Sequence, residues 1–600
     1  MQAAGKLSLY SLIICCVLMT AVGFFYYPKW NQPGSEATIS WDVSGYYMYL
    51  PATFIYKDLK QCSFKDSILS KYQPTPDFQQ AFQHPSGNYV MKYPAGQAIV
   101  MLPFFAAAHG YASLSAYPAD GFSLPYQFAI SMGMLLVAFI GLWLLRKILL
   151  LYFSDTVTAI TLLIVAFASN YLNYAAIDNG MVHNSLFTIY CLLILASILF
   201  YQQPNSKRAA TVGALIGLAT LIRPTEIIAV IIPLVWGIAS VKELTQRFLF
   251  FLQQFRFLLV AVISAAIVLS IQLAYWKYSS GEWVVYSYQE QGFSWLHPHL
   301  YRGMFSTNNG WLTYTPVMIL FFVGLPFLYK SYRSIFWPVL LFSGLFIYIC
   351  FAWDIWWYGG SMGMRAMIQA YPVLLFAVAA CIERLLTAKY SYRFMALAFL
   401  LFCSYYNLWL THQAHRGGLY RAGEMTDAYL KAIFLKWNAD PQTQFLLDRA
   451  DDAGGDIIAS SEVYSNNFDT ESDQYATTNY AISGKSILLG KDRQSTPEYF
   501  FNISGKQGDY LRCSAAFRTE QKEWNTWRMA QFIVKFYKAD VMVDYKMVRV
   551  FRVLNENETR RIYFDAKLPK GVDKASVSFW NAESDRPVLI DDLKVFLLEK

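Results

Sequence analysis

The stretch SLYSLIICCVLMTAVGFFYY, from Ser8 to Tyr27, carries no charged side chain. A run of about 20 apolar residues is long enough to cross ~30 Å of hydrocarbon as a helix. One such run also fits a buried helix of a large soluble protein, but about a dozen recur along this chain. The runs lie at 8–27, 97–112, 123–145, 157–174, 182–201, 209–222, 225–241, 257–276, 312–329, 335–352, 366–383 and 394–411.

The composition of the chain also indicates a membrane protein. Of its 600 residues, 56% are apolar and 15% are charged, whereas a soluble protein carries about 25% charged residues. The net charge of +8 needs no nucleic-acid partner, because the cytoplasmic loops of membrane proteins are basic. The sequence therefore predicts a polytopic α-helical protein whose first partner is the lipid bilayer.

The run at 97–112 decides which side of the membrane every later loop faces. If it does not cross, most of the later lysines and arginines face the cytoplasm, as the positive-inside rule requires. The run is short, follows Pro94 and Gly96, and contains Pro103 and His109, which suits a helix at the outer interface. We therefore expect about eleven spans, a cytoplasmic N-terminus, and a protein integral to the cytoplasmic (inner) membrane.

This topology divides the chain into regions. Residues 1–411 are expected to form the transmembrane domain, in which 28–122 is a first outer loop with juxtamembrane helices. Bulky residues and no small-residue cleavage site end the first apolar run, so it is expected to stay as an anchor. Residues 412–455 are expected to be a linker, and 456–600 a domain on the outer, periplasmic side.

The tail 456–600 has the pattern of a β-sandwich. Short segments of strand character alternate with polar turns, which is typical of that fold. The segment Ile590–Val595 resembles the closing strand of jelly-roll carbohydrate-binding modules, although a sandwich without a ligand, serving as a lid or docking surface, fits equally. The expected strands lie at 457–464, 499–503, 510–518, 530–537, 541–553, 561–568, 575–580 and 588–598.

The cysteines do not suggest a metal site. Only Cys62 and Cys513 lie in polar regions, and the sequence leaves open whether they form a disulfide. The others lie in apolar runs, where a free cysteine behaves as a small hydrophobe. The sequence has no CxxC pair and no Cys/His cluster of the kind that binds zinc.

One acidic residue stands among aromatic residues soon after the first span, in the segment Trp41–Pro51 (WDVSGYYMYLP). Four residues make about one helical turn, so Tyr46 would share a face with Asp42. Asp42 could act as a general base in an interfacial cleft. The spacing alone favours the other role, a cap for the helix that follows.

The segment Trp41–Pro51, with Lys92–Gly96 and Leu102–Phe105, resembles the GT-C superfamily of membrane glycosyltransferases. It is most similar to the protein O-mannosyltransferase and aminoarabinose-transferase branch. Those proteins place an acidic residue in the first outer loop, then juxtamembrane helices, then a span with a basic end, which Leu144–Lys147 matches. The resemblance covers residues 1 to about 411.

The resemblance implies an inverting transferase that moves a hexosyl or pentosyl group from a polyprenyl phosphate to a hydroxyl of a glycan, lipid or protein. Asp42 would accept the proton of that hydroxyl as positive charge develops on the attacking oxygen. Some relatives carry paired acids where this chain has Asp42 alone, which leaves metal dependence and the choice of base open. No cofactor is assigned, and a divalent cation stays open.

The spans are nearly free of ionisable residues, and the charges that touch them lie mostly at their outer ends. This indicates a polar site at the outer interface, because a mid-span charge is costly and typical of ion pathways. Asp178 is the second acidic candidate. It could bind the acceptor, the sugar or a metal ion, or simply form a turn before Asn179 and Gly180.

A leaving lipid phosphate needs cations or amide donors. Arg365 follows a loop rich in Trp and Gly, whose backbone can approach a ligand closely. Arg223 lies at a proline-broken hairpin and could instead snorkel; Lys92 and Arg302 are the other candidates. The sugar-pocket candidates are Tyr46, Tyr93, His183, Trp353 and Trp357, although a tryptophan there also fits the aromatic belt.

Other functions remain open at this point. A flippase or transporter for a lipid-linked glycan would also bind a lipid phosphate, but it would not need large outer regions. An envelope glycan polymerase or ligase would use similar donors and move whole oligosaccharides. A membrane anchor for the tail would need far fewer spans.

Overall fold

Each apolar run overlaps a helix in the computed structural model, which describes residues 5–289, 291–454, 457–470, 476–479, 481–504, 508–520, 530–582, 584 and 586–599. Seven helices in these ranges are long and apolar enough to cross a membrane, so the protein is an integral membrane protein; eleven spans remain a prediction. The helices are α1 (Lys6–Thr20), α2 (Trp41–Tyr47), α3 (Tyr49–Phe54), α4 (Lys65–Tyr72), α5 (Gly96–Ser113), α6 (Leu124–Leu149), α7 (Asp155–Phe167), α8 (Val182–Gln202), α9 (Ser206–Ile222), α10 (Ile231–Val235), α11 (Val241–Gln253), α12 (Phe255–Ser280), α13 (Leu300–Phe305), α14 (Trp311–Tyr314), α15 (Ile319–Ser331), α16 (Arg333–Ala352), α17 (Tyr371–Leu386), α18 (Tyr390–His412) and α19 (Asp427–Ile433).

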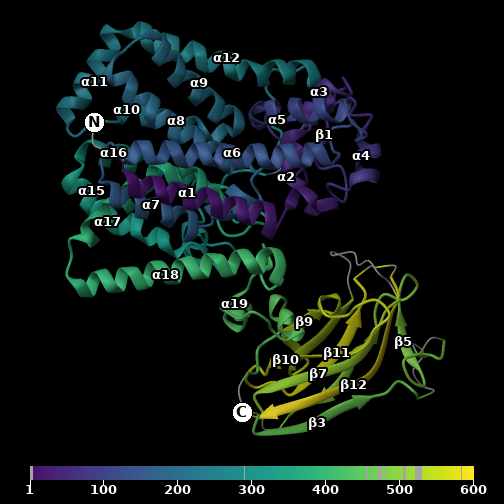
Figure 1. Cartoon of the computed structure of the whole chain (residues 1–600). Coiled ribbons are helices and arrows are strands. Elements are labelled where there is room, and N and C mark those ends of the chain that lie inside the picture. The colour runs from purple at the N-terminus through teal and green to yellow at the C-terminus, as the bar shows by residue number, and fades with distance from the viewer. Residues whose placement is uncertain are drawn as a thin grey trace. The chain divides into compact units, whose positions relative to one another are not determined.

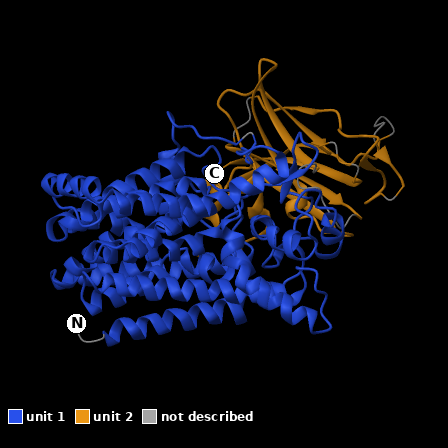
Figure 2. Ribbon diagram, turned by 90° about the horizontal axis from the view of Figure 1, so that it is seen from above, with its two compact units in different colours: residues 1–423 blue, residues 424–600 orange. Residues whose placement is uncertain are grey.

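The chain divides into two compact units, residues 1–423 and residues 424–600, which Figure 2 colours separately. The first unit holds helices α1 to α18 and one short hairpin, β1 (Ala81–Gln83) and β2 (Tyr89–Met91). The second unit holds α19 and the remaining strands. The boundary between the units falls inside the stretch expected to be a linker.

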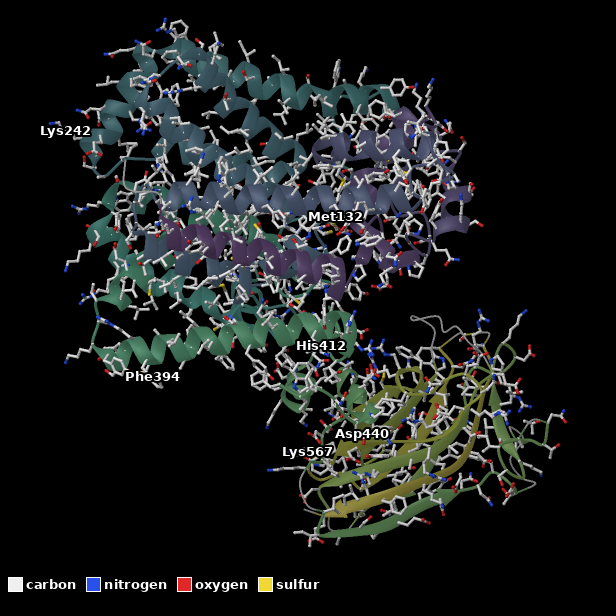
Figure 3. All side chains as sticks on the ribbon, in the orientation of Figure 1. Met132, Lys242, Phe394, His412, Asp440 and Lys567 are labelled. Atoms are coloured by element: carbon white, nitrogen blue, oxygen red, sulfur yellow. The ribbon has the colours of Figure 1, made fainter. Side chains whose placement is uncertain are left out.

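Within the first unit, the chain crosses repeatedly from one end to the other. Figure 3 places Lys242 of α11 and Phe394 of α18 at one end, and His412 at the opposite end of α18. The elements of the first outer loop, α2 to α4, gather at the end away from Lys242 (Figure 1). Loops expected to face the cytoplasm and the expected outer loop therefore lie at opposite ends of the helices.

Helix α5 contacts the ends of two other helices. A side chain at Gly96, in its first turn, would collide with the backbone of Leu221 and Ile222 at the end of α9. Near its other end, His109 shares a hydrogen bond of 2.6 Å with the Tyr126 hydroxyl at the start of α6. Both neighbours lie at expected outer boundaries, so this geometry agrees with a helix that does not cross.

Small residues let α9 and α12 approach closely. A Cβ on Gly213 would lie 2.0 Å from the Ala261 carbonyl oxygen, and one on Gly217 would lie 2.9 Å from the Ala265 Cα. This Gly-xxx-Gly spacing brings two helix backbones together, as is common in membranes. The close packing fixes the outer ends of both helices relative to each other.

The second unit is a β-sandwich of two antiparallel sheets that share one core. One sheet has the order β10-β7-β12-β5-β4, with β3 also paired to β12, and the other has the order β6-β11-β8-β9. The rings of Phe517 and Phe532, from opposite sheets, lie 5.6 Å apart. Jelly-roll topology remains a prediction. The strands are β3 (Ala459–Asn466), β4 (Ala476–Thr477), β5 (Ser486–Leu489), β6 (Tyr499–Asn502), β7 (Tyr510–Arg518), β8 (Gln531–Lys538), β9 (Val541–Arg549), β10 (Thr559–Lys567), β11 (Lys574–Trp580) and β12 (Val588–Glu599).

Every expected strand segment overlaps an observed strand, and the sequence analysis missed β4 and β5, which are too short to show alternation. The disulfide left open between Cys62 and Cys513 does not form. Both thiols are free, and each is buried in the core of its own unit.

Candidate functional site

A cavity of about 470 Å³ lies in the first unit and brings distant segments together. The first outer loop, the start of α8, the turn after α9 and the outer ends of α12 and α16 all contribute to its walls. The sequence-predicted candidates that line it are Asp42, Tyr46, Lys92, Tyr93, His183, Arg223, Trp353 and Arg365.

Asp42 does not cap a helix. The N-cap of α2 is Ser40, and Asp42 lies in the first turn with its carboxylate directed elsewhere. The Tyr93 hydroxyl donates to Asp42 Oδ1 at 2.6 Å, and Arg365 Nη2 donates to Asp42 Oδ2 at 2.8 Å. The capping alternative is therefore wrong, and Asp42 is part of the cavity wall.

The backbone just before Asp42 is unusual. Trp41 has a φ of 45°, which a bulky residue adopts only where its surroundings impose it, at a cost of order 1–3 kcal/mol. Its N–H donates to the Pro74 carbonyl oxygen at 3.1 Å. This turn sets the direction in which α2 starts, and therefore where Asp42 lies.

Two opposing effects set the pKa of Asp42. Burial raises the pKa, but the Arg365 charge, the hydrogen bonds from Tyr93 and Arg365 and the Lys92 charge together lower it below its ordinary value. The carboxylate is therefore ionised at neutral pH. It is a weak base toward a resting hydroxyl, and it can take a proton only as positive charge develops on the attacking oxygen.

Aromatic rings support this carboxylate. Tyr46 lies against Tyr93, with ring centroids 4.4 Å apart, and both rings line the cavity, as the one-turn spacing from Asp42 predicts for Tyr46. A Cβ on Gly45 would lie 2.6 Å from the Tyr93 ring, so glycine is needed for this approach. The Tyr49 hydroxyl also donates to the Tyr93 carbonyl oxygen at 2.7 Å.

The cavity also contains a buried network that sequence reasoning missed. Glu226 is only 1% exposed; it accepts hydrogen bonds from Gln369 Nε2 at 2.5 Å and from the Tyr190 hydroxyl at 2.6 Å. Gln369 Oε1 in turn contacts His183 Nδ1 at 2.8 Å and Arg223 Nη1 at 3.5 Å. An acid inside the apolar run 225–241 was the available signal, since such residues are typically functional.

Two buried donors on the cavity wall have no partner within the described residues. They are the Nε–H of Arg365 and the indole N–H of Trp276. A buried donor left unpaired costs about 1–3 kcal/mol. Both nitrogens have almost no accessible surface, so a ligand in the cavity could reach them only if the side chains shift.

Three candidates lie elsewhere. Asp178 forms an ion pair with Lys29 and accepts from Asn173 Nδ2 at 2.9 Å. Burial raises its pKa, but the charges of Lys29 and His415 and these hydrogen bonds lower it to about 2. Arg302 is exposed on α13, and Trp357 does not line the cavity; its carbonyl accepts from Asn309.

The described residues that line the cavity do not provide suitable ligands for a divalent cation. Asp42 already binds Arg365, and Glu226 is occupied by neutral donors near Arg223. The described residues contain no group of three His, Cys, Asp or Glu side chains placed to hold a metal ion. No catalytic step here is therefore assigned to a metal ion.

Six solved protein chains are similar to this chain, and they include the following two. Over 97% of its length the chain is similar to arabinosyltransferase EmbB from Mycobacterium smegmatis, at 10% identity and a TM-score of 0.39, and it spans 64% of that chain. Over 20% of its length it is similar to a family 16 carbohydrate binding module, at 15% identity and a TM-score of 0.15, and it spans 82% of that chain.

No family model and no curated protein sequence matches the chain. Because both TM-scores are low, the function proposed below rests on the residues of the cavity.

Proposed function

We propose that the protein is an inverting glycosyltransferase, which moves a sugar from a polyprenyl phosphate to a hydroxyl acceptor at the outer face of the cytoplasmic membrane. The observation that carries the proposal is that the Asp42 carboxylate lines the same cavity as three cations. Those cations are Lys92, Arg223 and Arg365. An anionic donor and a proton acceptor can therefore occupy the same space.

The shape of the cavity suits a lipid-linked sugar. Its wall on α12 and α16 is apolar, with Trp276, Phe346 and Ile349, and α12 carries exposed side chains such as Ile267 and Ile271 that suit contact with lipid. A prenyl chain could lie against this wall. The tyrosines of the outer loop and Trp353 supply ring faces and hydroxyls for the sugar.

The proposed reaction is a single displacement. The acceptor oxygen attacks the anomeric carbon from the face opposite the phosphate, and the bond between that carbon and the phosphate oxygen breaks. The bonding pair leaves with the phosphate, whose growing negative charge the cations stabilise. The acceptor proton passes to Asp42, and the anomeric configuration inverts.

We assign the remaining parts more broadly. Residues 424–600 would lie on the periplasmic side, where a β-sandwich could hold the acceptor or dock a partner. Asp178 is proposed as a structural ion pair near the N-terminal span, because it faces Lys29 and does not line the cavity.

The proposal is tested by transfer assays in membranes that contain the protein. Radiolabelled polyprenyl-phosphate pentoses and hexoses are supplied with glycan, lipid and peptide acceptors. We expect label to move from at least one donor to a hydroxyl, with the product of inverted anomeric configuration. Retention of configuration would rule out single displacement, and no transfer across the panel would favour a flippase or a ligase of larger glycans.

A further inference from the structure

The two arginines of the cavity have different surroundings. Arg365 forms an ion pair with Asp42 at 2.8 Å, and its side chain is 18% exposed. With Tyr93 on the other carboxylate oxygen, both oxygens of Asp42 are held in place. Arg365 is thus already committed to orienting the carboxylate.

Arg223 is not committed in this way. Among the described residues, no carboxylate lies within ion-pair distance of it, and its side-chain partners are the neutral groups Gln369 Oε1, at 3.5 Å, and the Tyr358 hydroxyl. Its guanidinium lies 5.6 Å from the ring centroid of Tyr358 and lines the cavity. Its cationic face is therefore available to a ligand.

The buried network holds Arg223 from one side. Gln369 contacts Arg223 through Oε1 and donates through Nε2 to Glu226, whose other oxygen accepts from Tyr190. Glu226 also interacts electrostatically with Arg223 without forming an ion pair. A charge fixed in this way needs little rearrangement when an anion arrives, which makes its binding stronger.

The charge of the cavity matches a phosphodiester. Its described charged residues are the cations Lys92, Arg223 and Arg365 and the carboxylates Asp42 and Glu226, which leaves one positive charge in excess. A sugar joined to a prenol through phosphate carries one negative charge.

We propose that Arg223, preset by Gln369 and Glu226, is the residue that binds the lipid phosphate, and that Arg365 is a positioning residue for Asp42. This inference rests on the proposed function. It assigns phosphate binding and the positioning of the carboxylate to two different arginines. Arg223 stabilises the electron pair that arrives on the phosphate oxygen as the bond to the anomeric carbon breaks. Arg365 keeps the carboxylate ionised and aimed until it takes the acceptor proton.

The test measures binding of radiolabelled undecaprenyl phosphate, which carries no sugar, to purified full-length protein in nanodiscs. We expect Arg223→Gln to weaken binding at least tenfold and Arg223→Lys to recover part of the loss. Arg365→Gln should change binding less than threefold. Arg384→Gln, an exposed arginine at the other end of α17, is the matched control.

Transfer kinetics give the second readout. Arg365→Gln should lower kcat with little change in donor KM, and it should move the acid limb of the kcat profile to higher pH. The sign follows because Asp42 must be ionised to accept a proton, and removing the guanidinium raises the pKa that it now lowers. Arg365→Lys should restore part of kcat and shift the limb back.

The outcomes separate the inference from the function on which it rests. Wild type that binds no undecaprenyl phosphate would overturn the proposed function itself. Wild type that binds, with Arg223→Gln binding equally well, would overturn the role of Arg223. Equal loss of binding in both arginine variants, with each still folded by its melting temperature, would overturn the division between them.

Discussion

Asp42→Asn is expected to lower the rate of sugar transfer by about 10²–10⁴-fold, the usual contribution of a positioned general base. Asparagine keeps the shape of the side chain and can still accept from Tyr93. It has no charge to hold the Arg365 guanidinium and cannot take up the acceptor proton. The measurement is the initial rate of radiolabelled sugar transfer in membranes, at matched protein levels.

Donor binding separates chemistry from folding in this experiment. Asp42→Asn should still bind undecaprenyl phosphate, because the proposed phosphate contacts come from Arg223. Asp66→Asn is the matched control, since Asp66 lies on α4 with a side chain 80% exposed and outside the cavity. Transfer that survives in Asp42→Asn would remove Asp42 from the role of base and move the search to Glu226, the other carboxylate that lines the cavity.

Gly213→Val is expected to prevent folding of the membrane unit. Its Cβ would lie 2.0 Å from the Ala261 carbonyl oxygen of α12, and a backbone cannot yield as a flexible side chain can. The helices must move apart, which loses close packing along their length and displaces Arg223 and Trp276, which lie near their outer ends. We expect a melting temperature at least 10 °C lower in detergent, or no monodisperse protein at all.

The matched control is Gly344→Ala on α16. A Cβ there has open space around it, and alanine favours a helix more than glycine does by about 1 kcal/mol. Its melting temperature should equal or exceed that of wild type. A Gly213→Val protein as stable as wild type would mean that α9 and α12 do not approach as described.

Elements with a strong period were predictable from sequence. The apolar runs predict helices because a segment that crosses a membrane must pair its backbone polar groups with one another. Strands such as β7 and β12 are long enough to show their alternating pattern. Strands β4 and β5 pair through only two residues of β4, which is too little signal. Helix α11 was missed because its apolar residues, including Leu244 and Phe248, recur on one face among polar residues and form no apolar run long enough to cross a membrane.

The candidate site was predictable in part. Asp42, Arg223 and Arg365 were singled out because a charge beside an apolar span needs a reason, and all three line one cavity. Sequence could not show that Arg365 reaches back across 323 positions to Asp42, since that pairing depends on the packing of the whole unit. It therefore could not separate a cation that orients the carboxylate from one that is free for a ligand.

The sequence analysis missed two residues of the buried network for the same physical reason. Glu226 and Gln369 lie inside apolar runs, and composition averaged over a window hides a single polar residue. Like Asp42, Asp178 is an acidic residue on the expected outer side of the membrane. In the structure, however, Asp178 forms an ion pair with Lys29 and does not line the cavity. A carboxylate's role depends on its partner, and the partner here lies 149 positions away.

The most direct test of the central claim follows both halves of the donor at once. Purified protein in liposomes receives a polyprenyl-phosphate sugar labelled with ¹⁴C in the sugar and ³²P in the phosphate, together with the acceptor identified in membranes. We predict that the ¹⁴C label moves to the acceptor while the ³²P label stays with the prenol. In Asp42→Asn, we predict that almost all of both labels stays together on the donor. If both labels move together, to the acceptor or to the other leaflet, the bond between sugar and phosphate is not broken and the protein is not the proposed transferase.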